Sequence, residues 1–256
     1  MQKFEETVRV ISQKQISEDI FDLWVETKEI AGIAKAGQFV SLYVEDDSRL
    51  LPRPISICEI KNNTMRFTYR VTGEKTGTKA FSKLVKGKEV RIIGPLGNGF
   101  PLKTGSKALL IGGGIGIPPM HELAKERKGQ SIVVAGYRDE TYLEEDLRLV
   151  SDLYIATETG SNGTKGTVID AIRENKLNAD VIYACGPMPM LKAVKEYAIN
   201  EGIMECYISL EEKMACGIGA CLGCVCNSKD IDSHTHVNNK RVCKEGPVFS
   251  AWEVEL

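Results

Sequence analysis

The cysteines near the end of the chain constrain its structure most, because they must close around a common centre. Cys216, Cys221 and Cys224 follow the spacing C-x4-C-x2-C, and Cys243 lies beyond a polar stretch. This is the spacing by which plant-type [2Fe–2S] clusters are held. The same loop contains three glycines, which let the backbone fold tightly and direct amide N–H groups at the cluster sulfurs. The pattern therefore predicts a [2Fe–2S] cluster.

Other readings of this segment remain open. A C-x2-C pair also holds structural zinc, although zinc sites usually consist of two close pairs and rarely need so much glycine. Extra cysteines can also be small buried hydrophobic residues that bind no metal. His234 and His236 could ligate iron in a Rieske-like arrangement, but their spacing is unusual for one. A solvated loop is the simpler interpretation of these histidines.

The spacing leaves two candidates for the fourth cluster ligand, Cys226 and Cys243. Cys226 is nearer than Cys243 to the other cysteines, but only Val225 separates it from Cys224. A strained loop would be needed to bring both of these sulfurs to one tetrahedral iron. Cys243 can return on a hairpin across residues 228–239, so we predict Cys243 as the ligand and Cys226 as a packing residue.

Length and composition limit the remaining choices. A chain of 256 residues can form two compact domains and a small appendage. Basic and acidic residues are interspersed at a net charge of −2, so we expect no binding to nucleic acid or to an anionic membrane. We see no signal-like segment and no membrane-spanning run, and therefore expect a soluble, cytoplasmic protein. Eight cysteines in that compartment favour a metal or redox centre over disulfides.

Hydrophobic periodicity divides the chain into three segments, which we predict as domains 1–101, 102–205 and 206–256. The first has short strands with Gly and Pro turns, which predicts a small antiparallel barrel. The second alternates strands and helices, which predicts a parallel sheet covered on both faces. The expected barrel elements are strands 7–12, 20–27, 39–44, 65–71 and 89–93 with a helix at 78–84. The expected α/β elements are strands 108–111, 131–137, 152–157 and 181–185 and helices 119–128, 167–175 and 188–199.

A glycine-rich turn follows the first strand of the second segment. Residues 109–119 run from an apolar strand through glycines into a proline-started helix. Glycines let the backbone approach a pyrophosphate, and the helix N-terminus supplies N–H groups to it. Ile117 stands where the common motif has its third glycine, so a plain strand-to-helix turn is the alternative. Cys185 ends another strand at the same sheet edge, where ligands bind in open α/β sheets, and this favours a dinucleotide site.

Two barrel segments are suited to a phosphate or to the edge of a flavin ring. Residues 51–56 place the fork-shaped cation of Arg53 and the hydroxyl of Ser56 on one proline-stiffened segment. Residues 69–78 lead into the single predicted helix of the barrel and offer its N-terminal amides to an anion. Either segment alone could be an ordinary turn. Both together, followed by a nucleotide fold, indicate a flavin site.

The chain resembles the ferredoxin–NADP reductase superfamily at several motifs. These are Arg-Pro-x-Ser at 53–56, Gly-Pro-Leu-Gly-Asn-Gly-Phe at 94–100, the glycine turn, and Ala-Cys-Gly-Pro at 184–187. With Glu-Glu-Lys-Met-Ala-Cys-Gly at 211–217 and the cysteines behind it, it closely resembles the electron-transfer subunits of class 1B dihydroorotate dehydrogenases. The resemblance covers essentially the whole chain. It implies a six-stranded antiparallel flavin-binding barrel, a Rossmann-like parallel-sheet nucleotide domain and a small C-terminal [2Fe–2S] module.

The resemblance also implies FAD and a [2Fe–2S] cluster as cofactors and NAD as co-substrate. By position, the residues that would hold FAD are Arg53, Pro54, Ile55, Ser56, Arg70, Val71, Thr72, Gly77 and Thr78. Those that would hold NAD are Gly112, Gly113, Gly114, Gly116, Cys185, Gly186 and Pro187. The matching cluster ligands are Cys216, Cys221, Cys224 and Cys243. No catalytic side chain is expected, because hydride transfer needs positioning and exclusion of water more than acid–base residues.

The implied activity is a relay in pyrimidine biosynthesis. Electrons would pass from the FMN of a dihydroorotate-oxidising catalytic subunit through the cluster and FAD to NAD⁺, in a heterotetramer of two copies of each subunit. Asp139 and Glu140 follow Arg138 after the strand at 131–137, and their charges would repel the 2′-phosphate of NADP, which favours NAD.

Two alternatives to this activity remain. The chain could serve another flavin and iron–sulfur complex, such as an NADH-dependent ferredoxin reductase, a sulfide dehydrogenase or a hydrogenase. It could instead be a flavin-free regulatory protein that uses a metal module to bind a partner. The docking partner separates the first alternative from the predicted relay, and the flavin content separates the second.

Overall fold

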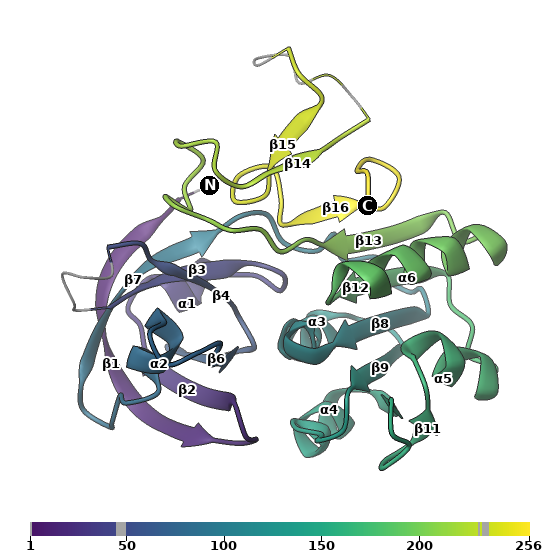
Figure 1. The fold of residues 1–256 in the computed structure, drawn as a ribbon, viewed down its shortest axis with the longest axis horizontal. Helices are drawn as coiled ribbons and strands as arrows, with labels where there is room; N and C mark the ends of the chain where they lie inside the picture. Colours follow the sequence, from purple (N-terminus) through teal and green to yellow (C-terminus); the bar gives the residue numbers. More distant parts are fainter. Residues whose placement is uncertain (1, 45–49, 230, 232–235) are drawn as a thin grey trace.

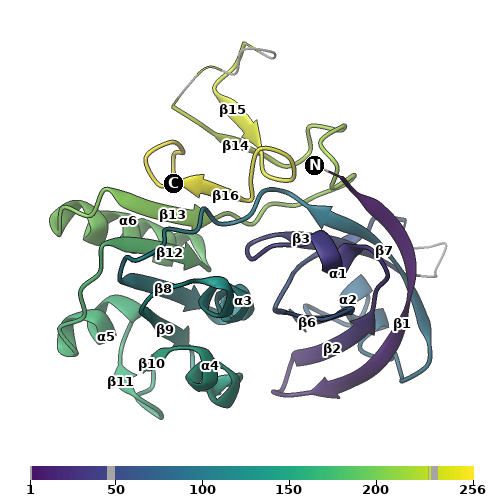
Figure 2. The ribbon, with the colours of Figure 1, turned by 180° about the vertical axis from the view of Figure 1, so that it is seen from behind.

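Two seven-stranded sheets stand side by side in this computed structural model, which describes residues 2–44, 50–229, 231 and 236–256 (Figure 1). The antiparallel sheet curls into a half-barrel, and the other sheet is parallel except for one edge strand. A small hairpin projects above them, as the view from behind also shows (Figure 2). Within the described residues, no helix is long and apolar enough to cross a membrane.

The half-barrel confirms the expected antiparallel architecture and adds to it. Its strands, in sheet order, are β4 (Arg53–Ser56), β3 (Phe39–Tyr43), β7 (Glu89–Leu96), β1 (Phe4–Gln15), β2 (Ile20–Glu26), β6 (Thr64–Arg70) and β5 (Glu59–Lys61). All five strands expected from the sequence are present, and β4 and β5 bring the sheet to seven strands in the described residues, where the resemblance implied six. Pro54 lacks an N–H donor and is tolerated because β4 lies at the sheet edge.

Alternating side chains build the core of the half-barrel. Val40 and Leu42 on β3 are fully buried in one cluster with Leu23 and Val25 on β2. Successive residues of a strand point to opposite faces, so Ser41 points away from this cluster. Two short helices, α1 (Ile30–Ile33) and α2 (Gly77–Phe81), complete the half-barrel, and α2 is shorter than predicted because it ends at Ser82.

The second sheet has the predicted α/β architecture. Its strands, in order, are β11 (Thr164–Lys165), β10 (Asp152–Thr157), β9 (Ser131–Tyr137), β8 (Ala108–Gly113), β12 (Val181–Cys185), β13 (Glu205–Ser209) and β16 (Val248–Ser250). Its helices are α3 (Pro118–Glu126), α4 (Glu144–Val150), α5 (Val168–Glu174) and α6 (Met188–Asn200). Leu110 packs with Met120 of α3 on one face, and Ile111 packs with Val194 of α6 on the other. Helices therefore cover both faces, as predicted.

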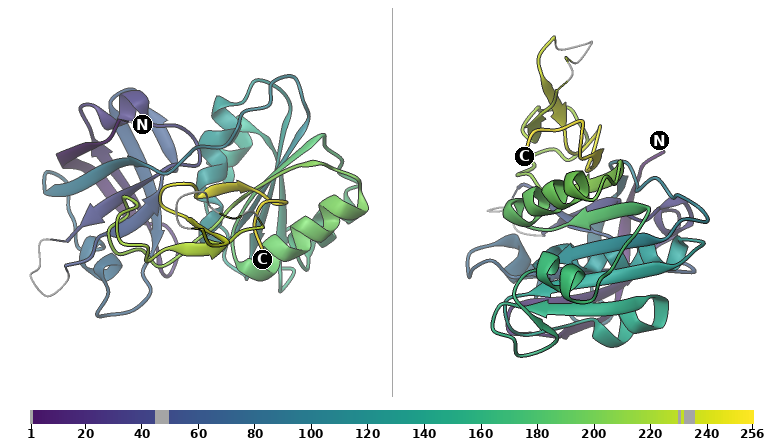
Figure 3. Two further views of the ribbon diagram at one scale, coloured as in Figure 1. Left: turned by 90° about the horizontal axis from the view of Figure 1, so that it is seen from above. Right: turned by 90° about the vertical axis from the view of Figure 1, so that its right-hand side faces the viewer.

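The chain beyond residue 205 contributes strands to this second sheet, which the sequence did not predict. β13 lies parallel to β12, and β16 returns antiparallel to β13 with Ser209 opposite Val248. Between them, β14 (Val225–Asn227) and β15 (Asn239–Arg241) form the expected return hairpin. Seen from above, the segment that carries the cysteines crosses the junction of the two sheets (Figure 3).

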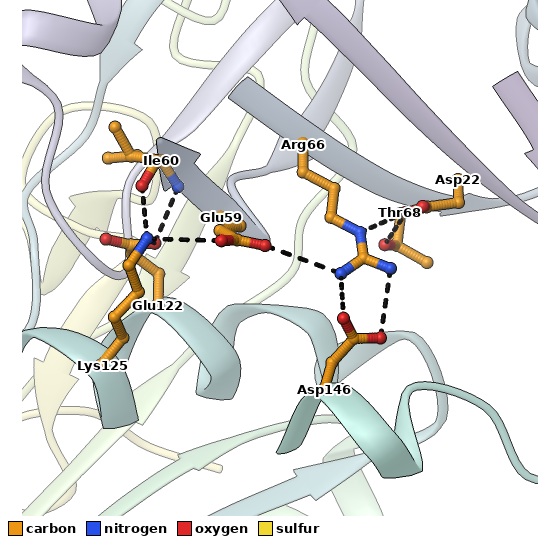
Figure 4. Close-up of polar contacts among 8 residues, drawn as sticks. All are labelled: Asp22, Glu59, Ile60, Arg66, Thr68, Glu122, Lys125 and Asp146. Carbon is orange, nitrogen blue, oxygen red and sulfur yellow. Dashed lines mark hydrogen bonds and ion pairs between the residues drawn. The ribbon is translucent and has the colours of Figure 1, made fainter. Parts of the chain in front are cut away.

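Buried polar contacts hold the two sheets together (Figure 4). Arg66 on β6 is only 7% exposed, and its Nε donates to Asp22 on β2 at 2.8 Å. Its Nη1 donates to Asp146 on α4 at 2.9 Å. Glu122 on α3 accepts a hydrogen bond from the Ile60 amide at 2.7 Å. Each contact to α3 or α4 joins the half-barrel to the second sheet, so this network fixes how the two units sit relative to one another.

Asp146→Asn is expected to lower the free energy of unfolding by about 1–2 kcal/mol, because it weakens a charged hydrogen bond to a buried guanidinium. Urea unfolding at neutral pH measures this loss. The control is Arg148→Ala on the same helix, whose ion pair with Glu144 is long at 3.9 Å and exposed. The control should lose less than about 0.5 kcal/mol. Equal losses in both variants would show that the contact of Arg66 with Asp146 stabilises the protein no more than a surface ion pair does.

Candidate functional site

The two predicted flavin segments of the half-barrel lie against each other. Nη1 of Arg53 donates to the Leu51 carbonyl at 2.6 Å. The guanidinium also covers Gly77, the first residue of α2, so closely that a Cβ there would lie 2.7 Å from Nε. Thr78 of the same segment accepts a hydrogen bond from the Thr72 amide at 3.4 Å. The structure thus gathers residues 53–56, 72 and 77–78 at one end of the half-barrel, with a fixed cation among them.

Arg70 connects this end of the half-barrel to the nucleotide turn. It lies at the end of β6, and its Nε forms an ion pair with Asp19 at 3.0 Å. Its Nη1 lies 4.0 Å from where a Cβ on Gly114 would be. Gly114 begins the turn that follows β8 in the second sheet. The predicted flavin and dinucleotide sites therefore border on each other, although their residues lie about 40 positions apart in the chain.

Most glycines of the nucleotide turn are required by packing within the protein. A Cβ on Gly116 would lie 2.2 Å from the Cys185 carbonyl oxygen, and one on Gly113 would lie 2.5 Å from the Met190 sulfur. Gly114 differs, because its φ is +52° and no protein atom lies closer than the Arg70 nitrogen to its Cβ position. The turn therefore packs tightly on the segment after β12, and Gly114 is the position at which it faces open space.

Three polar groups meet at the carboxyl edge of β12 and β13. Burial raises the pKa of the Cys185 thiol, the nearby Glu211 carboxyl raises it further, and a hydrogen bond with Ser209 opposes this. Glu211 keeps contact with solvent, but the protein atoms crowded around its carboxyl raise its pKa, and Arg70 partly offsets that rise. The Cys185 thiol, the Ser209 hydroxyl and the Glu211 carboxyl therefore lie together at the sheet edge where ligands bind in open α/β folds.

Glu211 was not among the predicted site residues. It stands two residues after β13, at the edge where ligands bind in open α/β sheets. A prediction of β13 from the sequence would have placed Glu211 at this edge, but β13 was not predicted.

The cluster loop gathers hydrogen-bond donors around Cys216. Burial opposes ionisation of this thiol, but hydrogen bonds from the Ile218 amide, from Cys221 and from the Ala220 amide outweigh burial and lower its pKa to about 6. Gly217 and Gly219 have φ angles of +68° and +90°, which side chains rarely adopt. A loop of this kind stabilises thiolates, the form in which cysteine binds iron.

The other two predicted ligands, Cys224 and Cys243, contact each other. The Cys243 amide donates to Sγ of Cys224 at 3.4 Å. Burial, followed by the neighbouring thiols of Cys224 and Cys216, raises the pKa of Cys243 to about 12. Cys226 lies on β14, and burial raises its pKa to about 11. Among the four predicted ligands, Cys224 is the one whose charge also raises the pKa of Cys226. The structure therefore brings Cys243, rather than Cys226, toward both Cys216 and Cys224.

The four predicted cluster ligands are all cysteines, the residue type that holds [2Fe–2S] clusters. Among the described residues, no three His, Cys, Asp or Glu side chains converge closely enough to hold one metal ion. A [2Fe–2S] cluster needs no such point, because each of its irons takes two thiolates. His236 is exposed, and His234 lies outside the described residues.

Comparison with solved structures defines the class of the protein. The structure of an NADH-dependent reduced ferredoxin–NADP oxidoreductase is 26% identical with a TM-score of 0.86, and the match covers 98% of this chain and 90% of that one. A ferredoxin reductase of carbazole 1,9a-dioxygenase shares the fold at 18% identity, with a TM-score of 0.67 over 79% of this chain and 67% of that one. The chain is thus a flavin-dependent oxidoreductase of the ferredoxin reductase fold.

Sequence comparison identifies the family. Residues 211–255 match the model of the iron–sulfur cluster binding domain of dihydroorotate dehydrogenase B. The dihydroorotate dehydrogenase B (NAD(+)) electron transfer subunits of Geobacillus sp. (strain WCH70) and Lysinibacillus sphaericus (strain C3-41) are 40% and 42% identical, each over 98% of this chain and 99% of the relative. The chain belongs to this family of electron transfer subunits. It is an oxidoreductase subunit whose cofactors are FAD and a [2Fe–2S] cluster, with NAD as co-substrate, as predicted.

Proposed function

We propose that this chain carries electrons from a dihydroorotate-oxidising, FMN-containing catalytic subunit to NAD⁺ in pyrimidine biosynthesis. The assembly would be a cytoplasmic heterotetramer with two copies of each subunit. The division into domains at residues 1–101, 102–205 and 206–256, and the cofactor contacts predicted from the sequence, are part of this proposal. β13 and β16 lie beyond residue 205 and pair within the second sheet, so the third region shares that sheet with the second.

One observation carries the proposal: a single strand leads from the nucleotide edge into the cluster loop. β13 ends at Ser209 beside Cys185, and Cys216 follows seven residues later. Seven residues span at most about 25 Å even when fully extended. Arg70 borders the same edge from the half-barrel side. The three predicted cofactor sites therefore meet around one sheet edge, an arrangement suited to passing electrons between them.

The roles of the residues follow from their contacts. Arg53 and Arg70 would neutralise and fix an anionic flavin cofactor, and the cysteines would hold the cluster as thiolates. The tight packing of the glycine turn on residues 185–190 would keep the nicotinamide at a fixed place. When bound, the cluster supplies single-electron transfer, and the flavin supplies the exchange between single electrons and a hydride.

The cluster loop also offers a surface for the catalytic subunit. Ile218 and Leu222 lie between and beside the cysteines, and they are 44% and 52% exposed. Exposed large apolar side chains within the loop that carries a redox centre favour a protein partner at that place. A partner that covers them would bring its own cofactor near the cluster.

The test is NADH formation with dihydroorotate as electron donor. This chain, loaded with its cofactors, is mixed with the FMN-containing catalytic subunit, and NADH is followed by its absorbance. NADH should appear only when both subunits are present. NADH-driven reduction of a dye by this chain alone serves as the control for the flavin and nucleotide sites. Dye reduction without coupling to dihydroorotate would contradict the proposed partner and point to another docking partner.

Arg53→Ala is expected to lower the FAD content after desalting by about 10- to 100-fold, because it removes a charged hydrogen-bond donor to the cofactor. Flavin released by denaturation is quantified by absorbance and divided by the protein concentration. Arg9→Ala is the matched control, since Arg9 is an exposed arginine on the same sheet. Undiminished flavin in Arg53→Ala would contradict the proposed role of Arg53.

A further inference from the structure

Ser41 lies between the half-barrel and the cluster loop. It is a β3 residue whose neighbours Val40 and Leu42 point into the barrel core, so its own side chain points outward. Nevertheless it is only 1% exposed, because the cluster loop covers it. Its Oγ is 2.7 Å from where a Cβ on Gly217 would be. Gly217 directly follows Cys216, so the hydroxyl lies against the backbone that holds the first cluster ligand.

The Ser41 hydroxyl has no hydrogen-bond partner among the described residues. Buried hydroxyls are nearly always paired, because an unpaired one loses its bonds to water without replacement. Within the described part of the chain, the Ser131 hydroxyl is the other buried serine hydroxyl without a hydrogen-bond partner. Ser131 begins β9 in the second sheet and pairs with Ala108 on β8. Ser41 is thus the unpaired buried hydroxyl that lies against the predicted cluster loop, at Gly217.

We propose that the Ser41 hydroxyl donates a hydrogen bond to a sulfur of the bound [2Fe–2S] cluster and raises the reduction potential of the cluster. This inference rests on the proposed cluster ligands. Sulfurs of an iron–sulfur cluster accept hydrogen bonds, and such bonds are one of the factors that set its potential. The reduced cluster carries one more negative charge than the oxidised cluster, so a donor stabilises the reduced state more.

Through Ser41, the half-barrel that contains the predicted flavin site would also contact the cluster. The residue belongs to β3 of the half-barrel, which pairs with β4, the strand that carries Arg53. One element thus supplies a donor to the cluster while its neighbour supplies the cation of the predicted flavin site. Gly217 is needed for the contact, because a side chain there would displace the hydroxyl, and its φ of +68° disfavours one independently.

The test compares Ser41→Ala with the wild-type chain, each purified with FAD and cluster. The cluster potential is measured by a redox titration followed by electron paramagnetic resonance, and the flavin potential by absorbance. Loss of the donor should reduce the equilibrium constant for cluster reduction about tenfold, which is a shift of about 59 mV to more negative potential for one electron. The flavin potential and the iron and sulfide contents should not change, because Ser41 ligates nothing.

Ser131→Ala is the matched control, since it removes a buried, unpaired serine hydroxyl from β9 of the second sheet rather than from β3 of the half-barrel. It should leave the cluster potential unchanged. An unchanged potential in Ser41→Ala, with normal cluster content, would overturn the inference and leave Ser41 as a packing residue. A wild-type chain without two irons and two sulfides per protein would instead contradict the cluster assignment in the proposed function.

Discussion

Cys243→Ser is expected to abolish the visible absorbance of the cluster, whereas Cys226→Ser is expected to leave it intact. Cys226 lies on β14, whereas Cys243 lies in the turn after β15, where its amide donates to Sγ of Cys224 at 3.4 Å. Removing one of four thiolates leaves an iron without its ligand, so the loss should be nearly complete. Iron, acid-labile sulfide and absorbance are measured on each purified variant.

NAD binding provides the internal control for this pair. The nucleotide turn lies in the second sheet and shares no residue with the cluster loop, so both variants should bind NADH as the wild type does. Cys221→Ser should behave like Cys243→Ser, because both are predicted ligands. A normal cluster in Cys243→Ser together with its loss in Cys226→Ser would reverse the assignment of the fourth ligand.

Gly116→Ala should eliminate NADH oxidation and destabilise the protein by at least about 3 kcal/mol, as expected for severe overpacking. Its Cβ would lie 2.2 Å from the carbonyl oxygen and 2.4 Å from the carbonyl carbon of Cys185. These are backbone atoms of a central strand, which cannot move without breaking the pairing of β12. Thermal unfolding and NADH-driven dye reduction measure the two effects.

Gly32→Ala is the matched control for this substitution. Gly32 lies in α1, and a Cβ there would have no atom within 4 Å. Replacing a helical glycine by alanine in open space should change stability by less than about 1 kcal/mol. Wild-type dye reduction in Gly116→Ala would mean that the turn relaxes, and that the close packing on Cys185 is not needed for nucleotide binding.

The long elements of the fold could be predicted because they carry periodic patterns. Apolar and polar residues alternate along much of β1, β2 and β6, whereas β8 and β9 are apolar runs next to helices. These patterns identify all five segments as strands. β5, β11 and β16 have three residues or fewer, which is too short for a pattern. β13 was missed although it has five residues, because the neighbouring cysteines drew it into the predicted cluster module.

The candidate site was predicted in its parts but not in its geometry. The cysteine spacing and the glycine turn are local signals, and they gave the positions of the cluster loop and the nucleotide turn. The contact of Arg70 with Gly114 depends on how two sheets dock, and no local pattern encodes it. The glycines at 113 and 116 also make room for residues 185–190, a packing role that the local pattern did not indicate. Ser41 gave no sequence signal, because one serine in a strand is ordinary.

The antiparallel pairing of β13 with β16 means that the iron–sulfur segment is an insertion rather than a tail. Ser209 and Val248 are direct partners, so the chain leaves the sheet and re-enters it about 5 Å away. Topologically, residues 210–247 are one greatly enlarged hairpin loop. Cutting the chain at residue 205 would remove two strands and expose β12, whereas replacing the loop by a short turn would keep the sheet order. A flavin reductase could therefore gain or lose its iron–sulfur relay by a change within a single loop, without the fusion of a separate domain.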